Sequence, residues 1–521
     1  MSVGDVVSAP VNQRLGVQRD RSMANARIAL TDSLHPREPW LLEIARPNRP
    51  ETYMRITIVG AGFSGSALAT QLASTEEGAP EVCLVGVGDT FARGVAYGQA
   101  RPEHLLNVRA GLLGTHPDRP DDFAPWLSLG LRDRDEFLPR VAYGDYLAER
   151  LREAHEAAGN LSLVRQEAIA ISRVGEGYRV HLDDGGYFAS DRVVLALGAL
   201  PPQRLAGIGP RLAQSPRYIG WPWQDNALER IEADARVLIV GTGLTMADVV
   251  ATLAARGHRG GLTAISRHGL PPRAHAAVPG PAIELPPSIR HALGGRDLRA
   301  LLAAVRSLVH VAPDWRSVVD GLRPHTQAFW RSLPDAQRAR FLRHLRSHWE
   351  AARHRIAPRV AEVLASLQAS GQLQVRAARL LRAGLRARAA EVLLRGRGQV
   401  QADVVQYDYV IRATGLDTDI VRTTHPLVSH LLDAGLVVAD PHGLGVEVGD
   451  DLQVRDRHGA PVRGLYCLGP LLRGRLWEIT AVPELRVAAA ALAATLRADT
   501  RSSVRRTGDG LVRELLLSAG L

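Results

Sequence analysis

Apolar residues in the first half of the chain follow two alternating patterns, short β-branched runs and longer stretches with helical spacing. A strand at 56–59 leads into a glycine turn, a helix at 66–73 and a strand at 81–85. The same order recurs later, with a strand at 237–240, a second glycine turn, a helix and a strand at 262–266. Strand, glycine turn, helix and strand in this order predict a dinucleotide-binding unit, and the chain contains it twice.

The remaining pattern predicts elements around these two units. Apolar alternation broken by glycines at 161–172, 178–183 and 192–197 indicates a β-meander. Leu and Ala at helical spacing predict a helical insertion at about 285–370, whose Trp residues we expect in its core. Further strands at 409–412 and 464–468 and a closing helix at 483–496 follow. The fold class is therefore predicted as α/β, with two Rossmann-like domains, a β-meander and a helical insertion.

The glycine turns supply the candidate cofactor-binding residues. Glycine permits the tight turn, the approach of backbone N–H groups to a pyrophosphate, and close packing of helix on strand. The first turn contributes Gly60, Gly62, Ser64 and Gly65, and the second contributes Gly241 and Gly243. Glycines that directly follow other predicted strands are also candidates: Gly198, Gly415 and Gly469.

The residue that ends the second strand of each unit discriminates between cofactors, because an acid there holds a ribose hydroxyl and an Arg accommodates a 2′-phosphate. The first unit has Gly86 at this position, and Asp89 could replace the missing acid. The second unit has Arg267, which favours NADPH over NADH unless it only covers an adenine. Met246 stands at the third glycine position of the second turn and weakens that motif.

Composition excludes several classes of protein. The 521 residues are enough for two or three domains, and 46% hydrophobic with 23% charged residues is typical of a globular chain. No apolar run is long enough to span a membrane and no secretory signal is evident, so we expect a cytoplasmic protein without a membrane partner. The net charge of +10 comes entirely from dispersed Arg residues, which argues against a nucleic-acid surface and mildly favours anionic ligands. No protein partner is predicted.

Two cysteines, Cys83 and Cys467, each lie in an apolar run and are predicted to be buried hydrophobic residues. Neither a disulfide framework nor a zinc site is expected, and the absence of a CxxC motif argues against a disulfide reductase.

Four segments together resemble a known family of flavoproteins. They are the first glycine turn, Arg93-Gly94-Val95-Ala96-Tyr97-Gly98, His104-Leu105-Leu106-Asn107-Val108-Arg109-Ala110, and Trp477-Glu478-Ile479-Thr480-Ala481-Val482-Pro483-Glu484-Leu485-Arg486. The chain is similar from Arg55 to about Leu496 to the family that includes bacterial FAD-dependent urate hydroxylases and L-aspartate N-monooxygenases. It is distantly similar to lysine and ornithine N-hydroxylases. Gly86 and Met246 depart from the family pattern.

The resemblance implies the cofactors and a division into domains. The first unit would bind FAD, with Asn107 and Val108 among its contacts, and the second would bind NADH or NADPH. The implied FAD-binding domain comprises 54–235 and 401–498, and the NAD(P)H-binding domain comprises 236–400. Residues 499–521 are expected to form a C-terminal tail. Residues 1–53 are either a disordered tail or no part of the natural protein, with Met54 as its start.

The chemistry expected of this arrangement is monooxygenation. Two facing units bring nicotinamide and flavin together for hydride transfer, and reduced flavin with O2 gives a C4a-hydroperoxide that transfers an oxygen atom. Urate, a small planar anion, is the substrate predicted first, because Arg offers a fixed fork of donors for it. Candidate anchors near the crevice are Arg109, Arg473 and Trp477, followed by Arg273, Arg475 and Tyr97. His104 is either a proton shuttle or a structural histidine, and no general base is identified.

Two alternatives remain open. The first is N-hydroxylation of L-aspartate or a similar amine, which would need an acidic or carbonyl cage facing the flavin. The second is a flavin-binding regulatory protein without oxygenation, against which the second glycine turn argues because it would have no purpose there. Quinone reduction is not excluded by the sequence.

Overall fold

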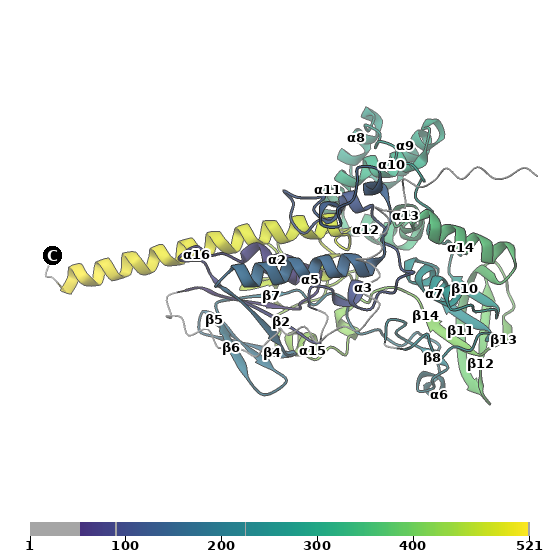
Figure 1. Ribbon diagram of the computed structural model, residues 1–521, viewed down its shortest axis with the longest axis horizontal. Helices are drawn as coiled ribbons and strands as arrows, with labels where there is room; N and C mark the ends of the chain where they lie inside the picture. Colours follow the sequence, from purple (N-terminus) through teal and green to yellow (C-terminus); the bar gives the residue numbers. More distant parts are fainter. Residues whose placement is uncertain (1–52, 89–90, 225, 519–521) are drawn as a thin grey trace, which may run out of the picture.

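The computed structural model describes residues 53–88, 91–224 and 226–518, and the side chains of these residues as far as residue 500. The expected N-terminal tail therefore lies outside the described residues except for Tyr53, and Asp89 lies outside them as well. Figure 1 shows two sheet-containing domains side by side, with a group of helices above them.

The first domain is built on a six-stranded sheet in the order β15-β16-β7-β1-β2-β3. All neighbouring strands are parallel except β15 and β16. The strands are β1 (Arg55–Val59), β2 (Glu81–Gly86), β3 (Leu161–Arg165), β7 (Arg192–Leu195), β15 (Gln453–Arg455) and β16 (Pro461–Cys467). Residues Ile56, Ile58, Val193 and Leu465 are at most 1% exposed because helices cover the sheet, as continuous apolar runs in parallel strands require.

A separate antiparallel sheet forms the β-meander: β4 (Ala168–Val174), β5 (Gly177–Leu182) and β6 (Tyr187–Ser190). The single strand expected at 161–172 is in fact two strands in different sheets, with the chain changing direction at Gln166 and Glu167. The third strand expected in the meander, at 192–197, is instead β7 of the six-stranded sheet, and β6 completes the meander. Helices of this domain are α2 (Phe63–Leu72), α3 (Gly94–Gly98), α4 (Phe123–Trp126), α5 (Arg140–Ala157), α15 (Pro426–Asp433) and α16 (Val482–Ser518).

The second domain contains a seven-stranded sheet in the order β13-β12-β11-β10-β9-β14-β8. Its strands are β8 (Tyr218–Ile219), β9 (Val237–Val240), β10 (Leu262–Ser266), β11 (Leu373–Arg386), β12 (Ala389–Gly396), β13 (Asp403–Tyr407) and β14 (Tyr409–Arg412). The strands from β11 to β8 are parallel, and β12 and β13 extend them as an antiparallel hairpin that the sequence pattern did not predict. Its helices are α6 (Pro210–Ala213), α7 (Leu244–Ala255) and α14 (Pro358–Ala369). The two parallel sheets confirm the predicted α/β fold class.

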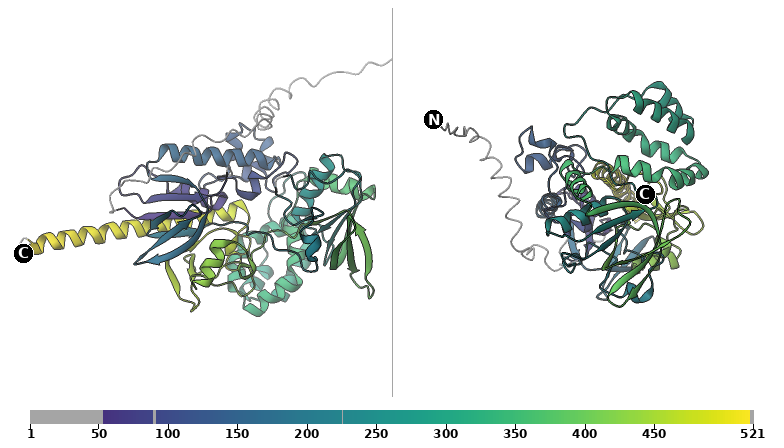
Figure 2. Two further views of the ribbon diagram at one scale, coloured as in Figure 1. Left: turned by 90° about the horizontal axis from the view of Figure 1, so that it is seen from below. Right: turned by 90° about the vertical axis from the view of Figure 1, so that its right-hand side faces the viewer.

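A helical insertion separates β10 from β11, and Figure 2 shows it standing apart from both sheets. It contains α8 (Pro287–Gly294), α9 (Leu298–Val311), α10 (Trp315–Leu322), α11 (Thr326–Ser332), α12 (Asp335–His344) and α13 (Arg346–Arg353). The helices expected over 285–370 are present, but the last of them, α14, packs into the core of the second domain through Val360 and Leu364. Trp330 is 3% exposed and lies in a core shared with Trp477 of the first domain.

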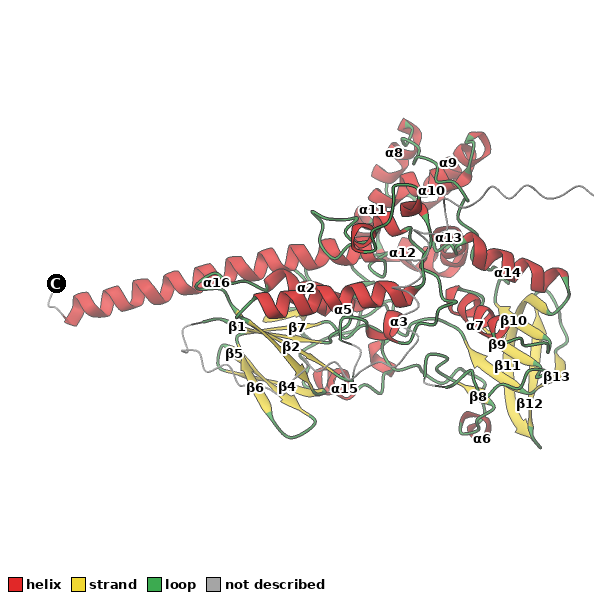
Figure 3. Cartoon of the chain, viewed as in Figure 1, coloured by secondary structure: helices red, strands yellow, loops and turns green. Residues whose placement is uncertain are grey.

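The last helix, α16, is longer than the sequence pattern predicted. It packs against α2 and continues to Ser518, and its far end projects from the body of the molecule (Figure 3). Within the described part of the chain, no helix is both long and apolar enough to cross a membrane.

Candidate cofactor and substrate site

The first glycine turn joins β1 to α2 and leaves no room for side chains at two of its positions. Gly60 has a φ of +110°, and a Cβ there would lie 2.3 Å from the Ala196 carbonyl oxygen. A Cβ on Gly65 would lie 1.9 Å from the Gly60 carbonyl oxygen, so only glycine lets α2 pack this closely on the turn. At Gly62, which caps α2, the nearest atom to a Cβ would be Gly94 Cα at 3.6 Å. The open start of α2 therefore fits a pyrophosphate.

A cavity of about 950 Å³ opens in front of this turn and is lined by residues of both domains and of the insertion. The residues predicted for the cofactor that line it are Gly60, Gly62, Ser64, Asn107, Val108 and Gly198, joined by Tyr97 and His104. Gly65 supports the turn from behind. Gly415 and Gly469 have φ values of +81° and +102°, and the residues that follow them, Leu416 and Pro470, line the cavity.

The missing acid of the first unit has a steric reason. A Cβ on Gly86 would lie 2.4 Å from Ala61 Cβ, so the glycine turn itself excludes an acidic side chain at this position. Gln166 and Glu167, which follow β3 beside the end of β2, line the cavity instead. Their carboxylate and amide are the groups that could hold a ribose here. The sequence did not single them out because they lie inside a run read as one continuous strand.

The second glycine turn joins β9 to α7 in the same way. Gly241 has a φ of +125°, and its Cβ would lie 2.0 Å from the Ala413 carbonyl oxygen, whereas Gly243 has open space around it. Met246, at the third glycine position, is fully buried in the core of the second domain, so it leaves the turn itself unobstructed. Leu244 and Thr245 line the cavity, so it reaches the start of α7, whereas the predicted Gly241 and Gly243 do not line it.

Arg267 is exposed directly after β10 and belongs to a group of basic side chains. Arg397 Nη1 lies 3.4 Å from His268 Nδ1, and the His268 and His348 rings are 5.6 Å apart. Partial burial, followed by nearby Arg397 and His348, lowers the pKa of His268. Such a group at the carboxyl end of the second strand is suited to a phosphate.

Two polar contacts join the domains beside the cavity. Arg140 donates to both carboxylate oxygens of Asp248, at 2.6 and 3.1 Å, and Asp248 lies on α7. His104 Nδ1 accepts from the Arg101 N–H at 3.2 Å, so Nε2 donates to Thr252 Oγ1 at 2.8 Å. Burial and then Arg140 lower the pKa of His104 to about 4, which keeps the ring neutral. These contacts favour the structural role for His104.

Of the side chains predicted to anchor the substrate, Tyr97 lines the cavity. The others, Arg109, Arg473, Trp477, Arg273 and Arg475, do not line it and contact protein groups instead. Arg109 donates to the Asp135 and Ala276 carbonyl oxygens at 2.5 and 2.7 Å. Arg473 donates to Glu350 at 2.6 Å and lies 4.5 Å over the Trp477 ring, which is 4.7 Å from the Trp330 ring. Of the secondary candidates, Arg475 pairs with Asp450 and Arg273 lies over Trp315 at 5.2 Å.

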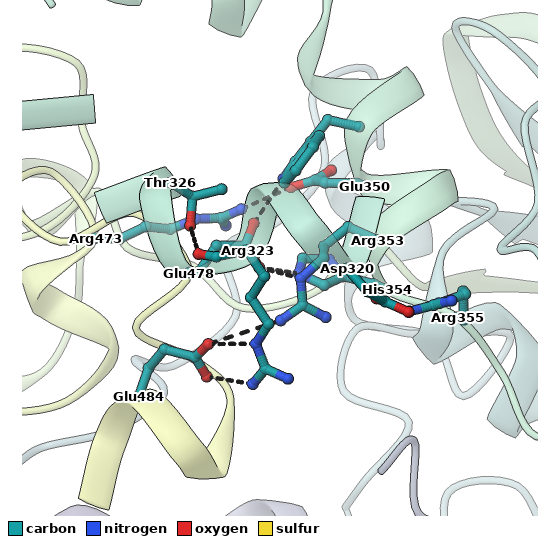
Figure 4. Close-up of polar contacts among 11 residues, drawn as sticks. Asp320, Arg323, Thr326, Glu350, Arg353, His354, Arg355, Arg473, Glu478 and Glu484 are labelled. Atoms are coloured by element: carbon teal, nitrogen blue, oxygen red, sulfur yellow. Dashed lines mark hydrogen bonds and ion pairs between the residues drawn. The ribbon is translucent and has the colours of Figure 1, made fainter. Parts of the chain in front are cut away.

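A network of charged residues joins the insertion to the segment before α16 (Figure 4). Glu478, with 1% of its side chain exposed, accepts from Trp349 Nε1 at 2.7 Å and contacts His354 Nε2 and Arg353 Nε at 3.3 Å each. Burial opposes its charge, but His354, Arg353 and Trp349 outweigh burial and lower its pKa to about 2. Arg323 pairs with both carboxylate oxygens of Glu484, at 2.7 and 2.9 Å.

Arg353 and His354, together with Arg355, line the cavity. No local pattern in the sequence marks these three residues, because they lie at the end of one of many Arg-rich helices. Within the described ranges, no three His, Cys, Asp or Glu residues gather where a metal could bind.

Comparison with known proteins agrees with this geometry. Residues 57–200 match the FAD-NAD(P)-binding family, so the chain contains an FAD/NAD(P)-binding domain. No curated protein sequence matches the chain.

Several solved structures share the fold. An ornithine N-hydroxylase from Kutzneria sp. 744, solved with reduced FAD, NADP+ and L-ornithine, has a TM-score of 0.57 at 16% identity, covering 88% of this chain and 100% of its own. Ornithine hydroxylase from Pseudomonas aeruginosa has a TM-score of 0.56 at 19% identity, covering 85% and 98%. The FAD-bound cadaverine monooxygenase from Erwinia amylovora has a TM-score of 0.57 at 17% identity, covering 84% and 92%. The chain thus has the two-domain, FAD- and NAD(P)-binding fold that these flavin-dependent enzymes share.

Proposed function

We propose that this protein is an FAD- and NADPH-dependent monooxygenase that hydroxylates the nitrogen of a small primary amine. The observation that carries the proposal is that one cavity of about 950 Å³ reaches both the first glycine turn and the start of α7. A hydride donor held at the start of α7 and a flavin held at the start of α2 can share this space, which hydride transfer requires. Bound FAD supplies the capacity to accept that hydride and to activate O2 for transfer of one oxygen atom.

The choice of an amine rests on the solved structures with the same fold, which include ornithine hydroxylases and a cadaverine monooxygenase. Urate, the substrate predicted first from the sequence, receives no such support. The Arg fork expected for it is also engaged elsewhere, since Arg109 and Arg473 bind protein groups outside the cavity. N-hydroxylation, which the sequence left as the alternative, is therefore the better supported function.

The protein's own residues would bind the cofactors and shield the site. The starts of α2 and α7 and the glycine turns before them hold the two pyrophosphates. The 2′-phosphate of NADPH would lie beyond the end of β10. Positive charge is provided there by Arg267, Arg379 and Arg397, and this favours NADPH over NADH. Trp221, Trp223 and Tyr97 contribute apolar surface to the cavity and exclude water from it.

The test is turnover by the FAD-loaded protein in air. Oxidation of NADPH and NADH is followed with L-ornithine, L-lysine, L-aspartate, cadaverine and urate, while hydroxylamine product and hydrogen peroxide are quantified. Amine-dependent NADPH oxidation that yields hydroxylamine with little peroxide supports the proposal. Loss of urate absorbance would instead support the urate hydroxylase reading. Failure of both nicotinamide cofactors to reduce the flavin would support the regulatory protein.

A further inference from the structure

One wall of the cavity is formed by three consecutive basic residues, the last residue of α13 and the two that follow it. Arg353, His354 and Arg355 all line the cavity. The Arg353 and Arg355 side chains are only 11% and 6% exposed, so water solvates their charges poorly. A desolvated guanidinium that faces a cavity gains strongly from an anionic ligand.

The carboxylates that hold these residues lie behind the wall. Glu478 contacts Arg353 and His354, and Asp320 pairs with Arg355, but neither carboxylate lines the cavity. Glu478 has a φ of +73°, a strained conformation for a residue with a side chain, and its three polar contacts hold it there. Glu478 belongs to the segment before α16, and Figure 4 shows it to one side of Arg353, His354 and Arg355.

Few carboxylates elsewhere in the cavity balance this charge. Among the lining residues only Glu167 and Asp248 are acidic, and Asp248 is bound by both ends to Arg140. Behind the wall, burial followed by Arg355 lowers the pKa of His275 to about 3, and Arg353 acts in the same direction. Arg93 and Arg140 also line the cavity, each beside a carboxylate, Asp145 and Asp248. The wall adds two further guanidinium groups and His354 on one side of the cavity.

We propose that Arg353, His354 and Arg355 form a subsite for a carboxylate of the substrate, and that Glu478 is the positioning residue that holds them toward the cavity. This inference rests on the proposed function, which it deepens. The substrate is then an amine that also bears a carboxylate, rather than a diamine. The cofactor pyrophosphates have their own sites at the starts of α2 and α7, so the subsite remains for the substrate.

The experiment measures binding without turnover. The oxidised, FAD-loaded protein is titrated with 5-aminopentanoate and with cadaverine, two amines of the same length that differ in one terminal group, and flavin difference absorbance gives each Kd. Wild type should bind 5-aminopentanoate at least about 10-fold more tightly than cadaverine, as expected for charge-assisted hydrogen bonds. Arg355→Ala and Glu478→Gln should reduce that preference to less than about 3-fold. Arg331→Ala is the matched control and should retain the preference, because Arg331 is an exposed Arg of the same insertion, on α11, that pairs with Asp450 at 3.6 Å.

His354→Ala provides a second variant, because this residue is 25% exposed and its loss leaves a smaller gap than the loss of a buried Arg. It should lower the preference several-fold, with a circular dichroism spectrum like that of wild type. Equal Kd values for the two amines in wild type would overturn the subsite. The subsite would also be overturned by a variant that weakens NADP+ binding but still prefers 5-aminopentanoate to cadaverine, since the wall would then bind a cofactor phosphate.

Hydroxylamine formation, measured separately, distinguishes this inference from the proposed function. If no amine is hydroxylated but the preference for 5-aminopentanoate is present and lost in the variants, the subsite stands and the proposed reaction fails. If hydroxylamine forms equally well from cadaverine with the same KM, the reaction stands and the subsite fails.

Discussion

Acid should loosen the contact between the two dinucleotide-binding domains through His104. Its pKa is lowered from 6.5 to about 4 in the folded protein, because burial and Arg140 disfavour the charged ring. In the unfolded chain His104 becomes protonated near pH 6.5. Between pH 6.5 and pH 4 the unfolded protein therefore binds more protons than the folded protein. Stability is therefore fully present above about pH 6.5 and is lost as the pH falls towards 4.

The size of the effect follows from these two pKa values. Between pH 7 and pH 5 this one histidine should remove about 2 kcal/mol from the free energy of unfolding, since each pH unit inside the window contributes about 1.4 kcal/mol. His275, whose pKa is lowered to about 3, acts in the same direction and must be separated from it. His104→Gln does this, because glutamine keeps a donor for Thr252 and does not titrate in this range.

Urea unfolding of wild type and His104→Gln at pH 7 and pH 5 gives the required comparison. The pH-dependent loss should be about 2 kcal/mol smaller in His104→Gln than in wild type. His310→Gln, at an exposed position on α9, should lose as much as wild type. An equal loss in wild type and His104→Gln would refute the argument, because the ring would then carry the same charge in both states.

Three further substitutions test other parts of the site. Gly62→Val should abolish FAD loading but leave the fold intact, since the nearest atom to a Cβ at this position is 3.6 Å away. A normal ratio of 450 nm to 280 nm absorbance in the purified variant would contradict the pyrophosphate site. Arg267→Ala should raise the KM for NADPH about 10-fold and leave the KM for NADH unchanged. This is the lower end of the effect of losing a hydrogen bond to a charged group, because neighbouring Arg residues remain. Asp248→Ala should lower the free energy of unfolding by about 3 kcal/mol, measured by thermal or urea unfolding. The substitution removes the carboxylate that pairs with Arg140, whose side chain is only 15% exposed. A loss below about 1 kcal/mol would show that water takes the place of the carboxylate.

The parts of this structure that depend on local pattern were predictable. Both glycine turns, the strands before them and the helices after them follow from short runs of apolar and small residues, and the structure has them in those places. Most of the helical insertion was also recovered. The β-meander was recovered only in part, because the strand predicted at 192–197 belongs to the parallel sheet and β6 was not predicted. Local patterns gave no information on which sheet a strand joins, and for this reason the two strands at 161–165 and 168–174 were predicted as one.

The candidate site was less predictable because its walls come from distant segments. Arg473 and Trp477 stand next to a glycine turn in sequence, yet they face the helical insertion and pack against Trp330 and Glu350. Arg355 carries no local signal, and its place in the cavity depends on how the insertion returns to α14. Chemistry assigned by proximity to a motif is therefore less secure than the motif itself.

The strand order has a consequence for how the chain is made. β16 lies between β7 and β15, with Leu465 beside Val193, so the FAD-side sheet is completed by residues synthesised after the entire second domain. During translation β7 has an open edge, and open edges pair readily with other chains. We expect chains truncated before Pro461 to aggregate even though both glycine turns are present. The last strand of the first domain thus emerges from the ribosome only after the whole second domain, with α16 still to follow.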